Sequence, residues 1–471
     1  MRHVRQTDLD RLGDIVGPDQ VLHEPADCWP YGYDNSKLQA LPEAVVFALN
    51  HEQVVAVTRL CHRARIPLIA RGRGTGTTGA TVPTTGGIVL SLERMNRIVE
   101  VDAGNRYLVC EPGATNQEVQ DAASQVGFFW PPDPTSAAFC TVGGNLAYNS
   151  AGPHAVKYGT PRENTLGLRV VTGSGESIRT GVYTSKGVVG YDLTRLLIGS
   201  EGTLATVTEA TLRLTPKAEA VATIEALYRD IESAAMAVSR IMAQPITPCA
   251  LEFMDKSAID MVRHHTEIEI PDEAGALLII EVDGPASLMT EACRVVTEVA
   301  TVNGLLRLRT ATDRDEADRL WHMRKALSPA LRTVAPGKIN EDVVVPVSRI
   351  PELISTLEVL SKRFSIQIVN FGHAGNGNIH VNLLVDPDNP AEMKRAHDCL
   401  DAVFDTVLAL RGTLSGEHGI GLVKKEFLAR ELDRETLAIM RDIKARFDPN
   451  NILNPGKMFP TEHSGENPET S

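Results

Sequence analysis

The clearest alternation of hydrophobic and polar positions begins at residue 44. An apolar run of strand length, AVVFAL, occupies 44–49, and a second one, PLIA, occupies 67–70. Between them, residues 51–65 place apolar side chains at the spacing of one helical face. A strand–helix–strand order of this kind predicts an α/β core.

More strands and one long irregular stretch follow. Five apolar segments predict strands with little helix between the first three: GIVLSL (87–92), RIVEVD (97–102), YLVCEPGA (107–114), LRVVTG (168–173) and ATVTEATLRL (205–214). Residues 130–167 are rich in Gly, Asn and Pro, and we expect a long loop there. Loops of that length in a compact domain usually serve a function.

The composition changes in the middle of the chain. Residues 220–299 alternate short apolar runs with helical patterns, which predicts an α+β domain whose sheet is covered on one face. A charged amphipathic helix is expected over 314–333, with a kink at Pro329. A last helix is expected over 434–446, and the polar residues after Pro460 are expected to be frayed.

The charge balance excludes several classes of protein. Among 471 residues, 47 Lys and Arg stand against 60 Asp and Glu, and the formal charge of −13 argues against a nucleic-acid surface or a polybasic membrane anchor. A hydrophobic share of 43% and a charged share of 23% exclude wholesale disorder and fibrous repeats. No apolar run approaches the roughly 20 residues of a spanning helix, and the polar N-terminus has no secretory signal core.

The seven cysteines form no CxxC pair, and their odd number leaves one over in any disulfide scheme. They are therefore interpreted as reduced, mostly packed thiols. We expect a cytoplasmic protein, with a peripheral position at the inner membrane as the alternative location.

A glycine-rich turn follows the strand at 67–70. Residues 71–79, RGRGTGTTG, interleave four glycines with two arginines and three threonines. Glycine at this density lets backbone N–H groups converge on an anion, so the turn can cradle a pyrophosphate. A tight turn without a ligand explains the glycines equally well, and the absence of GK[ST] excludes a Walker A loop. An NAD-type fingerprint would need a helix after the turn, where this sequence predicts a strand.

Two further segments contain small residues at similar density. Residues 131–159 are rich in small residues and amides, as expected around a large planar ligand, and 196–214 place a Gly-Ser-Glu-Gly turn before a strand. Three such loops suit an extended dinucleotide better than a single phosphate. On the residues alone, FAD and another nucleotide stay open.

Histidine and glycine concentrate in two later segments. His373 and His380 stand seven apart, with intervening glycines that predict a turn rather than a helix. The segment 415–421, SGEHGIG, adds Glu417 and His418. Two imidazoles and one carboxylate are a common ligand set for a divalent transition metal. Separate hydrogen-bonded loop histidines are the alternative that the spacing leaves open.

Seven motifs taken together identify a family. In chain order they are RGRGTGTTG (71–79), TVGGNLAYNSAG (141–152), VKYG (156–159), IGSEGTLATVTE (198–209), GHAGNGNIHVN (372–382), SGEHGIG (415–421) and DPNNILNPGK (448–457). Over roughly residues 40–460 the chain resembles the vanillyl-alcohol-oxidase-type FAD flavoproteins. Within them it is similar to the FAD-linked D-2-hydroxy-acid dehydrogenases, a branch that includes D-lactate dehydrogenase, the flavin subunit of glycolate oxidase and D-2-hydroxyglutarate dehydrogenase.

The resemblance implies an α+β fold. After an N-terminal segment, 1–40, a two-subdomain FAD-binding domain of the vanillyl-alcohol-oxidase (PCMH) type is expected over 41–217. A substrate or cap domain with an antiparallel sheet is expected over 218–412. A C-terminal segment with a helical stretch, 413–460, is expected to return to the FAD domain, and 461–471 to form a disordered tail.

The resemblance also implies where FAD binds. The residues expected around the pyrophosphate are Arg71, Gly72, Arg73, Gly74, Thr75, Gly76, Thr77, Thr78 and Gly79. Those expected along the ribityl chain and the flavin are Asp133, Thr141, Gly143, Gly144, Asn145 and Asn149, and those near the adenine are Glu201, Gly202 and Val207, with Asn454 as a further contact. Some relatives attach FAD through a histidine in or just after this loop; the loop here has none, so FAD is expected to be non-covalent. Cys140 is interpreted as a buried thiol rather than an attachment site.

A metal and a base are implied as well. In this branch the equivalents of His373, His380 and Glu417 bind a divalent metal, and the equivalent of His418 is the base. Relatives commonly have an aspartate where this loop has Asn376, and the loss of that charge is expected to weaken metal binding or change the ion bound. Zinc is the first candidate, with iron and manganese as alternatives.

The reaction implied by the resemblance makes further demands on side chains. A 2-hydroxy acid must lose its hydroxyl proton while hydride passes from C2 to flavin N5, and His418, in contact with the substrate, can take that proton. The substrate carboxylate needs a cation, preferably a bidentate guanidinium. Arg324 is the candidate because it matches the arginine of the family's WxxR helix; a solvated surface arginine is the alternative. Ser328, Lys338 and Asn382 are expected as further contacts.

Three functions are compatible with these observations. The first is an FAD- and metal-dependent D-2-hydroxy-acid dehydrogenase, with D-lactate ahead of glycolate and D-2-hydroxyglutarate. It would pass electrons to an external quinone, cytochrome or electron-transfer flavoprotein, since the sequence has no CxxCH and no cysteine cluster. The others are a flavin-dependent lyase or transferase of the alkyl-dihydroxyacetone-phosphate synthase type, and a non-catalytic flavin subunit of a larger oxidase complex. A homodimer through the middle domain is the expected oligomer.

Overall fold

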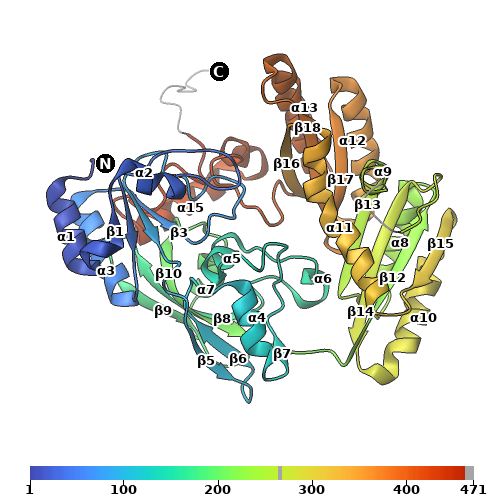
Figure 1. Cartoon of the computed structure of the whole chain (residues 1–471), viewed down its shortest axis with the longest axis horizontal. Coiled ribbons are helices and arrows are strands. Elements are labelled where there is room, and N and C mark those ends of the chain that lie inside the picture. The colour runs from blue at the N-terminus through green and yellow to red at the C-terminus, as the bar shows by residue number, and fades with distance from the viewer. Residues whose placement is uncertain (264–267, 462–471) are drawn as a thin grey trace. The chain divides into compact units, whose positions relative to one another are not determined.

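A computed structural model describes residues 1–263 and 268–461 (Figure 1). The chain divides into two compact units. Unit 1 comprises 1–150, 160–216 and the residues from 417 onward, and unit 2 comprises 151–159 and 217–416. The segment 151–159, expected within the FAD domain, thus belongs to unit 2. The expected tail after Thr461 lies outside the described residues.

Unit 1 begins with a four-stranded, mainly parallel sheet. Its order is β1-β2-β4-β3, with β1 antiparallel at one edge: β1 (Val21–Leu22), β2 (Ala44–Phe47), β3 (Leu68–Arg71) and β4 (Ile88–Ser91). Helix α3 (His51–Ala64) connects β2 to β3 and is capped by Asn50, whose side chain accepts a hydrogen bond from the backbone N–H of Gln53. The predicted strand–helix–strand unit is confirmed.

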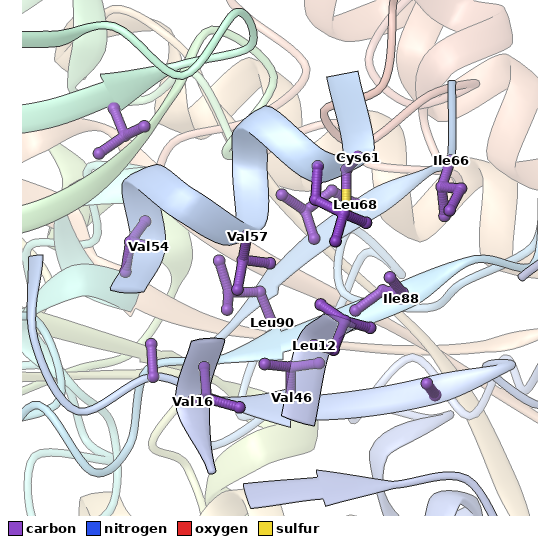
Figure 2. Packing of buried hydrophobic residues seen from close by; sticks show 14 of the residues in the cluster. Leu12, Val16, Val46, Val54, Val57, Cys61, Ile66, Leu68, Ile88 and Leu90 are labelled. Atoms are coloured by element: carbon purple, nitrogen blue, oxygen red, sulfur yellow. The ribbon is translucent and has the colours of Figure 1, made fainter. Parts of the chain in front are cut away.

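The core of this first sheet lies against α3 and against α1 (Gln6–Val16), an element that the sequence analysis did not assign (Figure 2). Leu12 from α1 and Val57 from α3 are both fully buried with Val46 and Leu90 from the sheet. Burying an aliphatic side chain contributes about 1.5–3 kcal/mol to stability. The cluster therefore fixes β3, the strand that leads into the glycine-rich turn.

The second sheet of unit 1 is antiparallel, in the order β5-β6-β10-β8-β9. Its strands are β5 (Ile98–Asp102), β6 (Tyr107–Cys110), β8 (Thr165–Thr172), β9 (Ser177–Gly181) and β10 (Ala205–Arg213), and a small ribbon pairs β7 (Phe128–Phe129) with β11 (Thr215–Pro216). The helices of unit 1 beyond α1 and α3 are α2 (Pro25–Cys28), α4 (Asn116–Ser124), α5 (Val142–Tyr148), α7 (Leu193–Leu197), α14 (Leu428–Glu431) and α15 (Arg434–Phe447).

The expectation of one long loop over 130–167 is wrong. This stretch contains α5 and, in unit 2, α6 (Ala155–Tyr158). Helix α5 forms although it includes two glycines, because the Thr141 side chain accepts a hydrogen bond from the backbone N–H of Gly144 and because Val142 and Leu146 are buried. Capping and burial override the weak helix propensity here.

Unit 2 is built on a seven-stranded antiparallel sheet in the order β15-β12-β14-β13-β17-β18-β16. Its strands are β12 (Ala220–Tyr228), β13 (Ala250–Asp255), β14 (Ala276–Gly284), β15 (Leu305–Thr310), β16 (Gly337–Val344), β17 (Gln367–His373) and β18 (Asn378–Val385). Its other helices are α8 (Ile231–Met242), α9 (Lys256–Val262), α10 (Met289–Ala300), α11 (Arg314–Val334), α12 (Ile350–Phe364) and α13 (Pro390–Ala409).

The expectation that this sheet is covered on one face is wrong. Successive residues of β13 and β14 point to opposite faces, and the whole of β13 and 276–282 of β14 are buried. Helices α9 and α11 pack on one face through Ile259 and Leu327. A continuous apolar run in the sequence is typical of a strand that is buried on both faces. Residues 276–280 form such a run.

Helix α11 carries the WxxR motif across one face of the unit 2 sheet. It continues from Arg314 to Val334 and is not broken at Pro329. Over the described ranges 1–263 and 268–461, no helix combines the length and apolar character needed to cross a bilayer.

Candidate active site

The glycine-rich turn leaves β3 in unit 1 and packs directly against the N-terminus of α5. A Cβ on Gly72 would lie 2.3 Å from Thr141 Oγ1, an approach that only glycine allows. Two of the three small-residue loops predicted around FAD are therefore in contact.

Arg71 turns its side chain into the protein. Nη1 donates to the backbone oxygen of Tyr33 at 2.8 Å and to Thr81 Oγ1 at 3.2 Å, and the residue is buried. The guanidinium fills the space in which a Cβ on Gly74 would stand. The structure thus gives Arg71 a role in holding the turn, and its contact with the pyrophosphate stays a prediction.

Glu201 joins the third small-residue loop to the C-terminal segment. Its carboxylate accepts hydrogen bonds from the backbone N–H groups of Ile420 at 2.6 Å and Gly421 at 2.7 Å. Burial raises the pKa of Glu201 to about 7, although both amides favour the charged form. Its backbone oxygen accepts from Asn454 Nδ2 at 2.6 Å. Both residues had been predicted as FAD contacts.

The segment that carries the predicted base is anchored on the glycine-rich turn. The backbone N–H of Leu422 donates to the Thr78 carbonyl at 2.7 Å, and Thr78 Oγ1 donates to the carbonyl of His418 at 3.3 Å. His418 is partly buried. Within unit 1, the predicted base and the loop predicted to hold FAD are therefore adjacent.

Lys457 is a buried basic residue in this part of unit 1. The residue is 2% exposed, and its Nζ has no hydrogen-bond partner among the described residues. Burial lowers the pKa of Lys457 to about 7, although Asp34 and Glu201 act in the opposite direction. A buried ammonium is costly unless an anion pairs with it. The glycine-rich turn and this ammonium fit FAD, whose pyrophosphate would supply the negative charge.

Lys457 is the last residue of the motif at 448–457, but it was not among the residues predicted to bind FAD. All the residues predicted to bind FAD lie in unit 1. Asn149 ends α5 with a φ of 59°, and its Oδ1 accepts from Thr160 Oγ1 at 3.0 Å and from the N–H of Arg162 at 3.1 Å. Asn149 thus has a structural role. Direct contacts with FAD stay predictions for all of these residues: Arg71, Gly72, Arg73, Gly74, Thr75, Gly76, Thr77, Thr78, Gly79, Asp133, Thr141, Gly143, Gly144, Asn145, Asn149, Glu201, Gly202, Val207 and Asn454.

Heat or acid precipitation is expected to release intact FAD from the polypeptide. The predicted loop has no histidine, and Cys140 is 3% exposed with a pKa raised by burial, which makes it a poor nucleophile. All seven cysteines are free thiols. Absorbance of the supernatant and the pellet measures the released fraction, and yellow colour that stays in the pellet would contradict the expectation.

The two predicted metal-binding histidines meet in unit 2. Strand β17 ends at His373, and after a tight turn β18 carries His380, so that the ring centroids lie 5.3 Å apart. Gly377 has a φ of 75°, and a Cβ there would lie 1.9 Å from the carbonyl oxygen of Val345, so the turn requires glycine. The hairpin supplies the turn that the seven-residue spacing needed.

Glu417, the third predicted ligand, is the first residue of the chain's return to unit 1. Directly before it, the N–H of Gly416 donates to the carbonyl of Asp342 at 2.9 Å. Asp342 is the register partner of His380. A joint site of Glu417 with the two histidines stays a prediction.

Arg324 is held on the sheet rather than in solvent. Its Nε donates to Glu252 Oε2 at 2.8 Å, and its guanidinium carbon lies 4.7 Å from the ring centroid of Phe371. The Arg324 side chain is 12% exposed, so the alternative interpretation of Arg324 as a solvated surface arginine is wrong. Its contact with a substrate stays a prediction.

The other residues predicted to bind the substrate lie in the same unit. Lys338 Nζ donates to Asn382 Oδ1 at 3.3 Å. Asn382 lies two residues after His380 on β18, so both side chains project from the same face of the strand. Ser328 lies on α11, one turn after Arg324; its backbone is part of the helix.

Glu252 provides a test of whether a metal fits this unit. Its Oε1 lies 2.5 Å from His373 Nδ1, which makes Nε2 the nitrogen that can face a metal. Burial opposes ionisation of Glu252, yet His373 and Arg324 hold its pKa below the usual range. A carboxylate bonded to one imidazole nitrogen is typical of a metal-binding histidine, so the residues fit a divalent cation. Glu252 lies outside the seven motifs and was not among the predicted site residues.

A second group of potential ligands in unit 2 was also not predicted. One ligand atom from each of His154, Cys249 and Glu281 lies within 4.8 Å of the others. Glu281 Oε1 accepts from Trp321 Nε1 at 2.6 Å and from Thr223 Oγ1 at 2.8 Å. These bonds tie the tryptophan of the WxxR motif to the sheet and so fix the helix that carries the predicted arginine.

Both halves of the chain match known family models. Residues 42–181 match an FAD binding domain, and residues 216–458 match the C-terminal domain of FAD linked oxidases. The glycolate oxidase subunit GlcD of Bacillus subtilis (strain 168) is 38% identical over 451 residues, which cover 96% of each chain. The D-lactate dehydrogenase of Archaeoglobus fulgidus is 36% identical over 458 residues, covering 96% of this chain and 98% of its own.

Solved structures bear out the fold. A p-cresol methylhydroxylase superposes with a TM-score of 0.79 at 19% identity, covering 97% of this chain and 98% of its own. An alkyldihydroxyacetonephosphate synthase superposes with a TM-score of 0.76 at 20% identity, covering 97% and 86%. The predicted fold class, an FAD-binding domain followed by an α+β domain, is confirmed.

Proposed function

Since this chain belongs to the family of FAD-linked oxidases and is an oxidoreductase acting on a CH–OH group, we propose that it oxidises a small D-2-hydroxy acid to the 2-oxo acid. D-lactate is the first candidate substrate, followed by glycolate and D-2-hydroxyglutarate. The glycolate oxidase subunit and the D-lactate dehydrogenase among its relatives support this substrate class.

In unit 2, a cation and one histidine of a pair bond to a single buried carboxylate, and this observation supports the proposal most strongly. Arg324 and His373 both bond to Glu252, and His380 is 5.3 Å from His373 between ring centroids. A 2-hydroxy acid has a carboxylate next to a hydroxyl. A guanidinium suits the carboxylate, and an imidazole pair suits a metal that binds the hydroxyl.

The side chains divide the work of the reaction. FAD, when bound by the loops of unit 1, supplies the acceptor for the hydride of the substrate carbon. His373, His380 and Glu417 would hold the divalent metal, which supplies Lewis acidity at the hydroxyl. Arg324 binds and orients the substrate carboxylate, with Ser328, Lys338 and Asn382 as further contacts.

His418 takes the hydroxyl proton. Histidine is the most frequent general base in enzymes, and the backbone of His418 is tied to Thr78 in the glycine-rich turn. The proton acceptor is thereby held on the unit that would bind the flavin. This is the arrangement needed if proton and hydride are to leave neighbouring atoms of one substrate.

Electrons then pass to an external acceptor, for which a quinone, a cytochrome or an electron-transfer flavoprotein is proposed. The relatives from Bacillus subtilis and Escherichia coli are described as subunits, so a partner protein is compatible with this proposal. We further propose a cytoplasmic location and a homodimer.

Anaerobic mixing of the purified flavoprotein with D-lactate, L-lactate and glycolate tests the function. The visible absorbance of the flavin should bleach with D-lactate and with glycolate, and not with L-lactate. A flavin that stays oxidised with every hydroxy acid would contradict the proposal and favour the lyase or the non-catalytic subunit.

Arg324→Ala is expected to raise KM by about 30- to 150-fold while FAD content stays normal. A charge-assisted pair with the substrate carboxylate is worth about 2–3 kcal/mol in the ground and transition states alike. Steady-state kinetics with an artificial acceptor measure the change. Arg307→Ala is the matched control, because Arg307 bonds to another buried glutamate, Glu225, through Nε at 3.0 Å. An unchanged KM in the Arg324 variant would contradict its role.

A further inference from the structure

Glu252 is bonded to two of the residues proposed to act on the substrate. Oε2 accepts from Arg324 Nε at 2.8 Å, and Oε1 lies 2.5 Å from His373 Nδ1. The residue is 1% exposed. The two oxygens of one carboxylate therefore contact a proposed carboxylate-binding group and a proposed metal ligand.

The backbone determines this triangle. Strands β13 and β17 pair in a register that places Glu252 opposite His373 and Met254 opposite Phe371. Met254 and Phe371 face α11 in the core of unit 2, and Glu252 and His373, two residues away on each strand, share that face. Arg324 reaches the same carboxylate from α11.

From this geometry we infer that Glu252 is a positioning residue that sets metal affinity and substrate binding together. Its Oε1 keeps the proton of His373 on Nδ1, so that Nε2 is the nitrogen presented to a divalent metal. Its Oε2 occupies Arg324 Nε, so that the two Nη groups form the edge for a bidentate carboxylate contact. The inference rests on the proposed function and adds how the two halves of the site are linked.

An amide cannot replace this carboxylate. In Glu252→Gln, an oxygen turned toward His373 places the NH₂ group against the Arg324 donor. The opposite orientation makes the amide a donor to His373, which must then move its proton to Nε2, the metal-binding nitrogen. Either orientation disturbs one partner, and exchange between them disturbs both.

A second buried glutamate provides the control. Glu225 on β12 is fully buried and accepts from Arg307 Nε at 3.0 Å and from Arg309 Nε at 2.7 Å. Like Glu252, it is a buried carboxylate that bridges two basic side chains of unit 2. It has no proposed role in the reaction, so Glu225→Gln reports the structural cost alone.

The experiment compares the full-length flavoprotein with its two glutamine variants. Zinc affinity is measured by competition with a chromophoric chelator, and KM is measured with D-lactate or glycolate, whichever bleaches the flavin. For Glu252→Gln we expect the zinc dissociation constant to rise by about 10- to 100-fold, and KM to rise at least tenfold. Glu225→Gln should keep both within about twofold and lose only thermal stability.

The outcomes separate the inference from the proposed function. If the wild type binds zinc and oxidises the acid while Glu252→Gln changes neither or only one of the two quantities, the inference is overturned and the function stands. If the wild type binds no zinc and reduces no flavin with any hydroxy acid, both are overturned. Should Glu252→Gln not fold, Glu252→Asp provides the same test, because the shorter side chain cannot span Arg324 and His373 together.

Discussion

His418→Ala is expected to slow the reduction of bound flavin by its hydroxy acid by about 10²- to 10⁴-fold, the usual contribution of a general base. FAD content, metal content and substrate affinity should stay close to those of the wild type. The Thr78 hydroxyl donates to the backbone carbonyl of His418, not to its imidazole, so the substitution leaves this anchor in place. Only the proton acceptor is removed.

Anaerobic stopped-flow measurement of flavin bleaching gives the rate constant, and elemental analysis gives the metal content of the same sample. His397→Ala is a suitable control, since His397 is exposed on α13 and its Nδ1 lies 2.7 Å from the carbonyl oxygen of Met393. Flavin reduction at the wild-type rate in His418→Ala would assign the proton transfer to another group.

Removal of the divalent metal is expected to abolish turnover while the spectrum of oxidised flavin stays essentially unchanged. His380→Ala should produce the same state, because it deletes one of two imidazoles that lie 5.3 Å apart. Without a cation on the substrate hydroxyl, that hydroxyl stays too weak an acid for a histidine to deprotonate efficiently. Asn376 in place of the aspartate of relatives should make the metal easier to strip.

Dialysis against a chelator, followed by zinc, manganese or ferrous iron, tests this expectation and identifies the active ion. The two histidine substitutions should differ: His418→Ala keeps its metal and loses rate, whereas His380→Ala loses both. A metal-free wild type that reduces its flavin at full speed would refute the metal assignment and leave His373 and His380 as hydrogen-bonding groups.

Much of the local structure could be predicted from short patterns. The apolar runs at 44–49 and 67–70 correspond to β2 and β3, and the helical spacing at 51–65 corresponds to α3. The glycines between His373 and His380 predicted a turn, and the hairpin of β17 and β18 confirms it. Such features depend on residues close in sequence, because the periodicity of their side chains and the freedom of their backbone determine the local structure.

Local patterns failed where packing overrode propensity. The stretch 130–167 looked like a loop because of its Gly, Asn and Pro content, yet α5 forms there under the cap of Thr141. The unit 2 sheet was expected to be covered on one face, and it is buried on both. The cap of α5 is local, but Val142 and Leu146 are buried in a cluster with residues distant in sequence. The burial of the unit 2 sheet likewise depends on helices distant in sequence.

The sequence by itself determined the family, the strand–helix–strand unit at 44–70 and the histidine, glutamate and arginine candidates of the seven motifs and the WxxR helix, because each of these is carried by a contiguous stretch of sequence. Only the tertiary structure revealed Glu252 and Lys457. Glu252 looks like an ordinary polar residue of a strand until the β13–β17 register sets it opposite His373 and α11 brings Arg324 to its other oxygen. Lys457 looks like a surface lysine until the fold leaves the residue only 2% exposed, near the acidic Glu201 and Asp34. Strand register, helix docking and desolvation arise from long-range packing, and no short pattern encodes them.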